Sequence, residues 1–108
     1  MSSTFNNVQI VGMHFRGAQA KEYAAALQPG DTLTLEREAD NQYDQNAIKV
    51  MTPGEYSFHL GYVNRHTAAW LAPEMDEGVE FVVTVIEVKM AKNNVYPYVD
   101  IAPAEVDA

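Results

Sequence analysis

Apolar and polar residues alternate over several short stretches of the chain, which is the pattern of strands that are buried on one face. TLTLERE at 32–38 and AIKVM at 47–51 both follow this period of two. Shorter or less regular apolar runs occur at 7–13, 58–63 and 79–103, and the last is long enough for two strands. The pattern therefore predicts about six strands.

Two other segments have the composition of helices. Residues 17–31 are rich in alanine and end at Pro29 and Gly30, which stop a helix. Residues 64–76 begin at Asn64, a favourable N-cap, and we expect Pro73 to end or bend this second helix. Three of its apolar residues are expected to face the core: Ala68, Trp70 and Leu71.

Turn residues separate the predicted strands at short intervals, which favours a mostly β fold, an antiparallel sheet or small barrel with two short helices, over a parallel α/β fold. The last two strands are expected to join around Lys92, Asn93 and Asn94, because asparagine tolerates the left-handed backbone of a tight hairpin. Pro97 implies an edge position or a bulge in the final strand. We expect 1–108 to form one domain, with a core at about 8–102 and a short acidic C-terminal tail.

Charge narrows the classes of partner. The chain has 7 Lys and Arg against 15 Asp and Glu, a formal net charge of −8, which works against a broad basic surface for nucleic acid. The sequence has no apolar run near ~18 residues and no secretory signal, so we expect a cytoplasmic protein with no membrane contact. Zero cysteines exclude a disulfide, a thiolate zinc site and a cysteine nucleophile.

Signatures of catalysis and of metal binding are missing from the sequence. His14, His59 and His66 stand on three separate predicted elements, without a metal-binding spacing, so we expect no metal and no other cofactor. There is no nucleophile elbow and no glycine-rich phosphate loop, so we expect no enzymatic activity. Asp40 and Asp44 could form an acid–base pair, but carboxylates this close together in a turn more typically cap it.

Aromatic and polar side chains gather instead at three predicted strand ends, in MHFRG, DNQYDQNA and LGYVNR. These segments offer two rings, a carboxylate, an amide and two cations: Phe15, Tyr43, Asp44, Asn41, Arg16 and Arg65. Tyr43 is unexpected, because a bulky ring contributes nothing to turn formation. The set suits single-stranded nucleic acid, in which a base stacks on a ring and a cation binds a phosphate. Alternatively, Phe15 and Tyr43 cover small apolar clusters under their loops.

Three separated motifs resemble the HIRAN domain, a module found at the front of Swi/Snf-class helicase-like proteins and as free-standing small proteins of bacteria and phages. They are VGMHFRG, PGDTLTLEREADNQYDQNAIKV and HLGYVNRHTAAWLAPEMDEG, in the family's order and spacing, and together they cover about residues 8–90. The resemblance implies a small antiparallel OB-like β-barrel with two helices. It also implies capture of the 3′ end of single-stranded DNA, with two rings around a base and an aspartate on the terminal hydroxyl.

Carried over by position, the resemblance makes Tyr43 a stacking ring, Asp44 the acceptor of the terminal hydroxyl and Asn41 a neighbouring contact. Phe15 falls at the position of the second ring, and Arg65 at that of a phosphate-binding lysine.

Three positions depart from the pattern of the DNA-binding members. His14 stands where they have an arginine, Tyr62 where they have a histidine, and Gln42 where the turn has a proline. Histidine carries less charge than arginine at neutral pH, so we expect modest affinity, with Arg16 as an additional cation.

The sequence thus predicts a non-enzymatic module that binds the 3′ end of single-stranded DNA, beside a helicase or another protein partner, as an accessory of DNA repair or replication in a bacterial or phage-infected cell. The alternative is an acidic protein-interaction or DNA-mimicking module on the same fold, encoded by a phage and docking on a basic partner without binding DNA.

Overall fold

The computed structural model describes residues 3–104, with the side chain of His14 outside the described part. In chain order its elements are β1 (Phe5–Val11), the 3-10 helix η1 (Met13–Phe15), α1 (Ala18–Ala26), β2 (Thr32–Arg37), β3 (Ile48–Met51), β4 (His59–Val63), α2 (Arg65–Asp76), β5 (Phe81–Ala91) and β6 (Asn94–Pro103). The strands pair antiparallel in the order β1-β4-β3-β2-β5-β6 and close into a barrel. The predicted mostly β fold with six strands and two helices is confirmed, with η1 as an additional short element.

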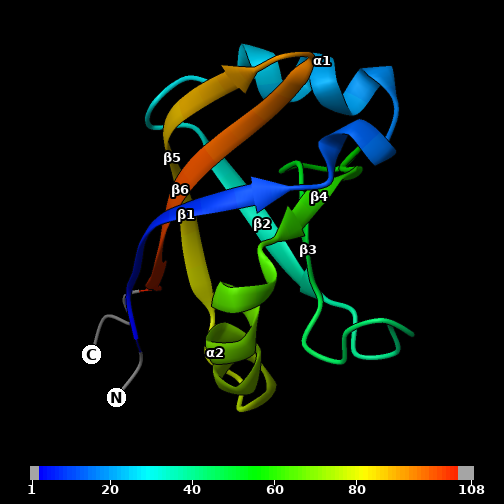
Figure 1. The fold of residues 1–108 in the computed structure, drawn as a ribbon. Helices are drawn as coiled ribbons and strands as arrows, with labels where there is room; N and C mark the ends of the chain where they lie inside the picture. The colour runs from blue at the N-terminus through cyan, green and yellow to red at the C-terminus, as the bar shows by residue number, and fades with distance from the viewer. Residues whose placement is uncertain (1–2, 105–108) are drawn as a thin grey trace.

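The barrel core is built by the inward-facing residues of each strand. β6 shows the alternation most clearly, because Val95, Pro97, Val99 and Ile101 are buried while the residues between them are partly exposed. The helices lie at opposite ends of the barrel, and the loop between β2 and β3 extends to one side of α2 (Figure 1). Among residues 3–104, neither helix has the length and apolar character needed to cross a bilayer.

Pro97 occupies a position where β6 is paired on one side only. β5 pairs with β6 along the whole hairpin, including Val88 opposite Pro97, whereas the ladder between β1 and β6 ends at Tyr98. This is a local edge, as predicted for Pro97. The hairpin turns at the expected residues, but the left-handed backbone falls on Lys92, with φ of 56°, and not on an asparagine.

Helix α2 begins as predicted and continues past Pro73, so of the two predicted effects of this proline the helix end does not occur. The side-chain oxygen of Asn64 accepts a hydrogen bond from the Thr67 N–H at 3.0 Å, which confirms the N-cap. The helix ends only at Asp76. Pro73 itself is exposed, so the backbone carbonyl that loses its hydrogen-bond partner to the proline is on the solvent side of the helix.

The prediction that Trp70 faces the core is wrong. Its side chain is 68% exposed, whereas Ala68, Leu71 and Ala72 are fully buried. With 3.6 residues per turn, these three alanine and leucine positions share one face of α2, and Trp70 is turned away from it.

Gly61 in β4 brings the β1 end and η1 close to the strand that carries Tyr62. A Cβ atom at Gly61 would lie 2.6 Å from the Val11 carbonyl oxygen and 2.7 Å from the Met13 Sδ. A side chain at this position would therefore push β1 away from β4, and with it one wall of the groove described below.

Candidate nucleic-acid interface

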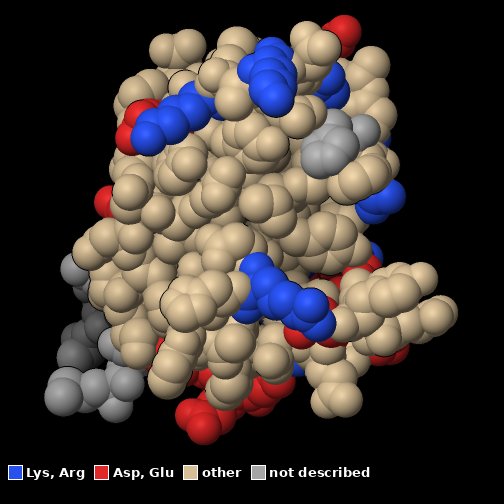
Figure 2. Space-filling model, in the orientation of Figure 1, with Lys and Arg blue, Asp and Glu red and all other residues tan. Residues whose placement is uncertain are grey.

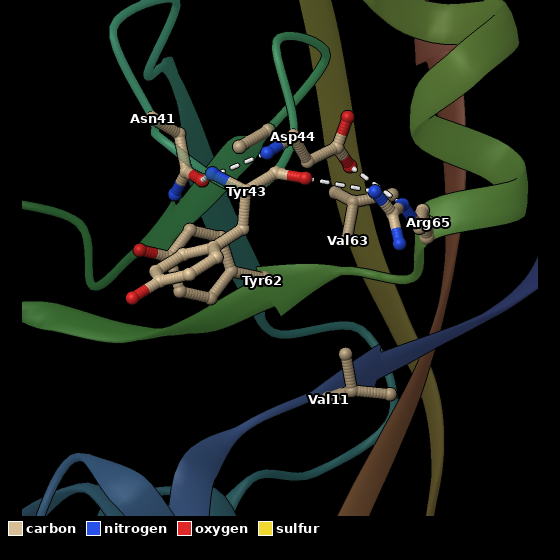
Figure 3. Close-up of a pocket in the computed structure, with 8 residues that line it drawn as sticks. Val11, Asn41, Tyr43, Asp44, Tyr62, Val63 and Arg65 are labelled. Atoms are coloured by element: carbon tan, nitrogen blue, oxygen red, sulfur yellow. Dashed lines mark hydrogen bonds and ion pairs between the residues drawn. The ribbon is translucent and has the colours of Figure 1, made fainter.

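The loop of residues 38–47 is shaped by its own polar side chains (Figure 3). The Asn41 Oδ1 accepts hydrogen bonds from the backbone N–H groups of Tyr43 and Asp44, at 2.8 and 3.0 Å. The Asp44 Oδ1 accepts from the Asn46 N–H at 2.9 Å. Small polar residues on either side of Tyr43 therefore form the turn, which leaves the tyrosine ring free for another role.

Arg37 holds the C-terminal part of this loop against the end of α2. Its guanidinium donates to the backbone carbonyls of Ala47 at 2.8 Å and Gln45 at 3.0 Å. The same group donates to both carboxylate oxygens of Asp76, at 2.8 and 3.1 Å. Their hydrogen bond raises the pKa of Arg37 and lowers the pKa of Asp76, so both groups are charged at neutral pH.

Glu38 holds the N-terminal part of the loop. Its Oε1 accepts from the Tyr62 hydroxyl at 2.9 Å and from the Asn41 side-chain amide at 2.5 Å, and its Oε2 lies 3.2 Å from the Lys49 Nζ. The hydrogen bond from Asn41, with smaller contributions from Tyr62 and Lys49, keeps the pKa of Glu38 below its ordinary value despite the opposing effect of burial. Burial and the bond to Glu38 raise the pKa of Tyr62, whose phenol is therefore protonated at neutral pH.

Between this loop, β1, β4 and α2 lies an open groove of about 410 Å³. Its lining combines an apolar floor with rings and polar groups: Val11, Asn41, Tyr43, Asp44, Ala47, Tyr62, Val63 and Arg65. The Tyr43 side chain is 86% exposed and that of Phe15 is 76% exposed. These exposures contradict the alternative that the two rings cover apolar clusters under their loops.

Arg65, the first residue of α2, connects the helix to the loop. Its Nη2 donates to the Tyr43 carbonyl at 2.8 Å, and its Nε lies 3.6 Å from the Asp44 Oδ2. The Arg65 side chain is still 77% exposed, whereas that of Asp44 is only 22% exposed. Asp44 thus has the turn-capping role that the sequence left open, and its second oxygen faces a guanidinium and not a backbone donor.

Arg16 lies behind Tyr62 and does not line the groove. The carbonyl of Gly61 can only accept, so the His59 Nε2, 2.8 Å away, carries the proton and the His59 Nδ1 accepts from the Arg16 Nη1 at 2.8 Å. Burial lowers the pKa of His59, which agrees with this neutral ring. The His59 ring packs edge-on against the Tyr62 ring with centroids 4.7 Å apart, so Arg16 is connected to the groove through two rings.

The structure thus brings together five residues predicted from the sequence, namely Asn41, Tyr43, Asp44, Tyr62 and Arg65. Phe15 and Arg16 are exposed at and just after η1, outside the groove lining, and the side chain of His14 lies outside the described residues. Sequence reasoning missed Arg37, Glu38, Lys49 and His59 as the groups that hold the site in place. The adjacent Arg37 and Glu38 at the strand end, just before the polar loop, were the available signal.

Within the described residues, no group of three or more His, Asp or Glu side chains is arranged to hold a metal ion. His59 lies in β4 and His66 in α2.

The fold and this groove define a small closed antiparallel barrel with exposed rings and cations beside a fixed polar loop. The model of the HIRAN domain family matches residues 4–101, so the chain belongs to the HIRAN domain family. No curated protein matches the sequence at a significant level.

Two solved structures are similar to the chain. A protein from Lactobacillus plantarum superposes with a TM-score of 0.72 and 28% identity, over 91% of this chain and 92% of that one. The HIRAN domain of human HLTF superposes with a TM-score of 0.68 and 21% identity, over 93% of this chain and 74% of that one. At 21% identity, the similarity to the domain of human HLTF is evidence for a shared fold alone.

Proposed function

We propose that the chain works as a single-domain, non-enzymatic module that binds single-stranded DNA in the groove and prefers a free 3′ end. The observation that carries the proposal is the Tyr43 ring, 86% exposed on a loop that Asn41 and Glu38 hold in one conformation. A large exposed ring on a fixed loop is a stacking platform, and the fold does not need it. Membership of the HIRAN family, whose modules bind DNA, supports the same function.

The groove offers a partner to each part of a terminal nucleotide. The base stacks on Tyr43, for roughly 1 to 3 kcal/mol, and Tyr62 forms the neighbouring wall. Arg65 is 77% exposed and can bind a phosphate with the donors that do not contact Tyr43 and Asp44. The Asp44 Oδ2 accepts no hydrogen bond from the backbone of its loop and can accept one from a terminal hydroxyl.

Phe15 and Arg16 extend the proposed site beyond the groove. The Phe15 ring is 76% exposed, and we assign it as the second stacking face. The side-chain partner of Arg16 is the neutral ring of His59 and not a carboxylate, so its guanidinium is available to a second phosphate. His14, the other predicted contact, belongs to the same proposal on the basis of its position in the sequence.

Fluorescence anisotropy with a labelled short oligonucleotide tests the proposal. We expect tighter binding of an oligonucleotide with a 3′-hydroxyl than of the same strand with a 3′-phosphate, because the phosphate brings a like charge to Asp44. Low ionic strength is required, since the protein carries a net charge of −8. Equal affinity for the two ends would refute end recognition, and no binding at low salt would refute DNA binding itself.

A further inference from the structure

Helix α2 presents an outer face that neither the core nor the groove uses. Exposed residues recur along it at helical spacing: His66, Ala69, Trp70, Pro73 and Glu77. The opposite face buries Ala68, Leu71 and Ala72 against the barrel. Trp70 is 68% exposed at the centre of the outer face. Tryptophan is seldom this exposed in a monomeric protein, and it is enriched in the centres of protein interfaces.

The charge around this face is negative. Towards the end of α2 the exposed acidic residues are Glu77 and, after the helix, Glu80, whereas the charge of Asp76 is offset by Arg37. Arg65 is the only basic residue of α2 other than His66, and it lies at the first position, bonded to the loop of the groove. Figure 2 shows the Asp and Glu side chains gathered at the end of the molecule where Figure 1 draws the end of α2.

These charges discriminate between three classes of occupant. A DNA strand that continued along α2 would bring its phosphates towards the carboxylates, which is unfavourable. A second copy of the chain, docked through the same face, would bring together two surfaces with the same excess of negative charge, because a two-fold interface pairs a surface with itself. A positively charged protein segment is attracted to the same carboxylates, and a Lys or Arg side chain binds the face of an indole.

We propose that the outer face of α2 docks a basic protein segment, in which a Lys or Arg side chain stacks on Trp70 and a neighbouring cation pairs with Glu77. The surface is separate from the groove, so the segment and a DNA end can occupy the molecule together. This inference does not depend on DNA binding.

The sequence supplies the reporter for a test, because Trp70 is the only tryptophan of the chain. The probe is a short synthetic peptide that repeats Lys-Leu-Ala-Arg, with a control peptide in which Glu replaces Lys and Arg. We expect the basic peptide to change the emission of Trp70 and the acidic peptide to leave it unchanged. An oligonucleotide bound in the groove is expected to leave this emission unchanged as well.

Matched variants separate docking on Trp70 from general attraction to an acidic protein. With a labelled basic peptide, we expect Trp70→Ala to weaken binding about five- to tenfold. Tyr56→Ala removes a ring that is 89% exposed elsewhere and should bind like the native protein. Glu77→Gln should weaken binding more than Glu22→Gln, which removes the same charge from exposed surface on α1.

Four results would overturn the inference. The native protein fails to bind the basic peptide at low salt, or Trp70→Ala binds it as well as Tyr56→Ala does, which leaves charge alone as the cause. Alternatively, Trp70→Ala weakens the binding of an oligonucleotide, which assigns the face to DNA. Finally, the native protein dimerises and Trp70→Ala does not, which assigns the face to a second copy.

Discussion

At the scale of single residues, the Tyr43 ring takes no part in the hydrogen bonds that form its own loop. Asn41 and Asp44 accept the backbone hydrogen bonds of the turn, and the Tyr43 carbonyl binds Arg65, so the ring itself contributes little to the fold. We therefore expect Tyr43→Ala to weaken the binding of single-stranded DNA by about 1 to 3 kcal/mol, the loss of one stacked base. Anisotropy titrations measure the affinity.

Thermal unfolding provides the control for this variant. A side chain that is 86% exposed buries little area, so the Tm of Tyr43→Ala should stay close to the native value. A variant that binds DNA like the native protein would remove Tyr43 from the site. A large drop in Tm would show that the ring packs in the core after all.

The two carboxylate oxygens of Asp44 are assigned different roles. Its Oδ1 caps the turn at the Asn46 N–H, whereas its Oδ2 is the proposed acceptor of the terminal hydroxyl. Asp44→Asn keeps the shape and one acceptor oxygen, and it removes a charge-assisted hydrogen bond worth roughly 1.5 to 3 kcal/mol. We expect weaker binding of 3′-hydroxyl oligonucleotides and better tolerance of a 3′-phosphate.

The test compares both kinds of end in the native protein and in Asp44→Asn, with the Tm recorded on the same samples. A fall in Tm with no change in the preference for one end would leave Asp44 with only the turn-capping role. In that case Arg65, and not Asp44, would set the affinity of the groove.

At the scale of elements, the β2–β3 loop depends on Glu38 for its attachment to β4. Glu38→Gln weakens the bonds of this side chain to Tyr62, Asn41 and Lys49, which should lower the local stability of the loop by about 1 kcal/mol. We therefore expect the Tyr43 and Asp44 amides, which donate to Asn41, to exchange roughly fivefold faster. Glu36→Gln is the matched control, because Glu36 also lies near the Lys49 Nζ, at 3.7 Å, without any bond to the loop. Hydrogen exchange followed by NMR measures both variants.

The depressed pKa of Glu38 gives this attachment a pH dependence. A carboxyl group with a lowered folded-state pKa stabilises the fold fully above its ordinary pKa, and this contribution disappears as the pH falls through the lower folded value. The protection of the Tyr43 and Asp44 amides, taken relative to their intrinsic exchange rates at each pH, should therefore decrease in that acid range in the native protein and in Glu36→Gln. If Glu38→Gln loses protection over the same range, another group is responsible for it.

The sequence predicted the elements well because the period of two is a local signal. The strands at 32–38, 47–51 and 58–63 appear within one or two residues of the predicted bounds, and the Asn64 cap is present. The environment of Trp70 was not predictable in the same way, because in a short helix with several alanines a large apolar residue need not be the one that is buried. Arg37 and Glu38 look like solvent-facing strand residues until the chain folds, since their partners lie on α2 and β4.

At the scale of the whole molecule, the net charge of −8 is distributed unevenly relative to the groove. Lys49, the basic residue closest to the Glu38 network, is engaged by Glu36 and Glu38 at 3.7 and 3.2 Å. Arg65 is 77% exposed, and Arg16 is exposed beside a neutral histidine. The proposed site therefore has two cations available for phosphates, Arg65 in the groove lining and Arg16 outside it, and the rest of the surface repels a nucleic-acid strand on balance.

Two available cations make the salt dependence of DNA binding shallow. At ~0.7 for each phosphate contact with a single strand, the slope of log affinity against log salt should be about −1.4. Arg65→Gln should reduce it to about −0.7, because one contact is removed. Lys92→Gln, a charge change in the exposed turn of the β5–β6 hairpin, should leave the slope unchanged. Anisotropy titrations over a series of salt concentrations give these slopes. A much steeper native slope, or one that Lys92→Gln reduces as much as Arg65→Gln, would mean that DNA binds along a different, more basic surface that includes the hairpin.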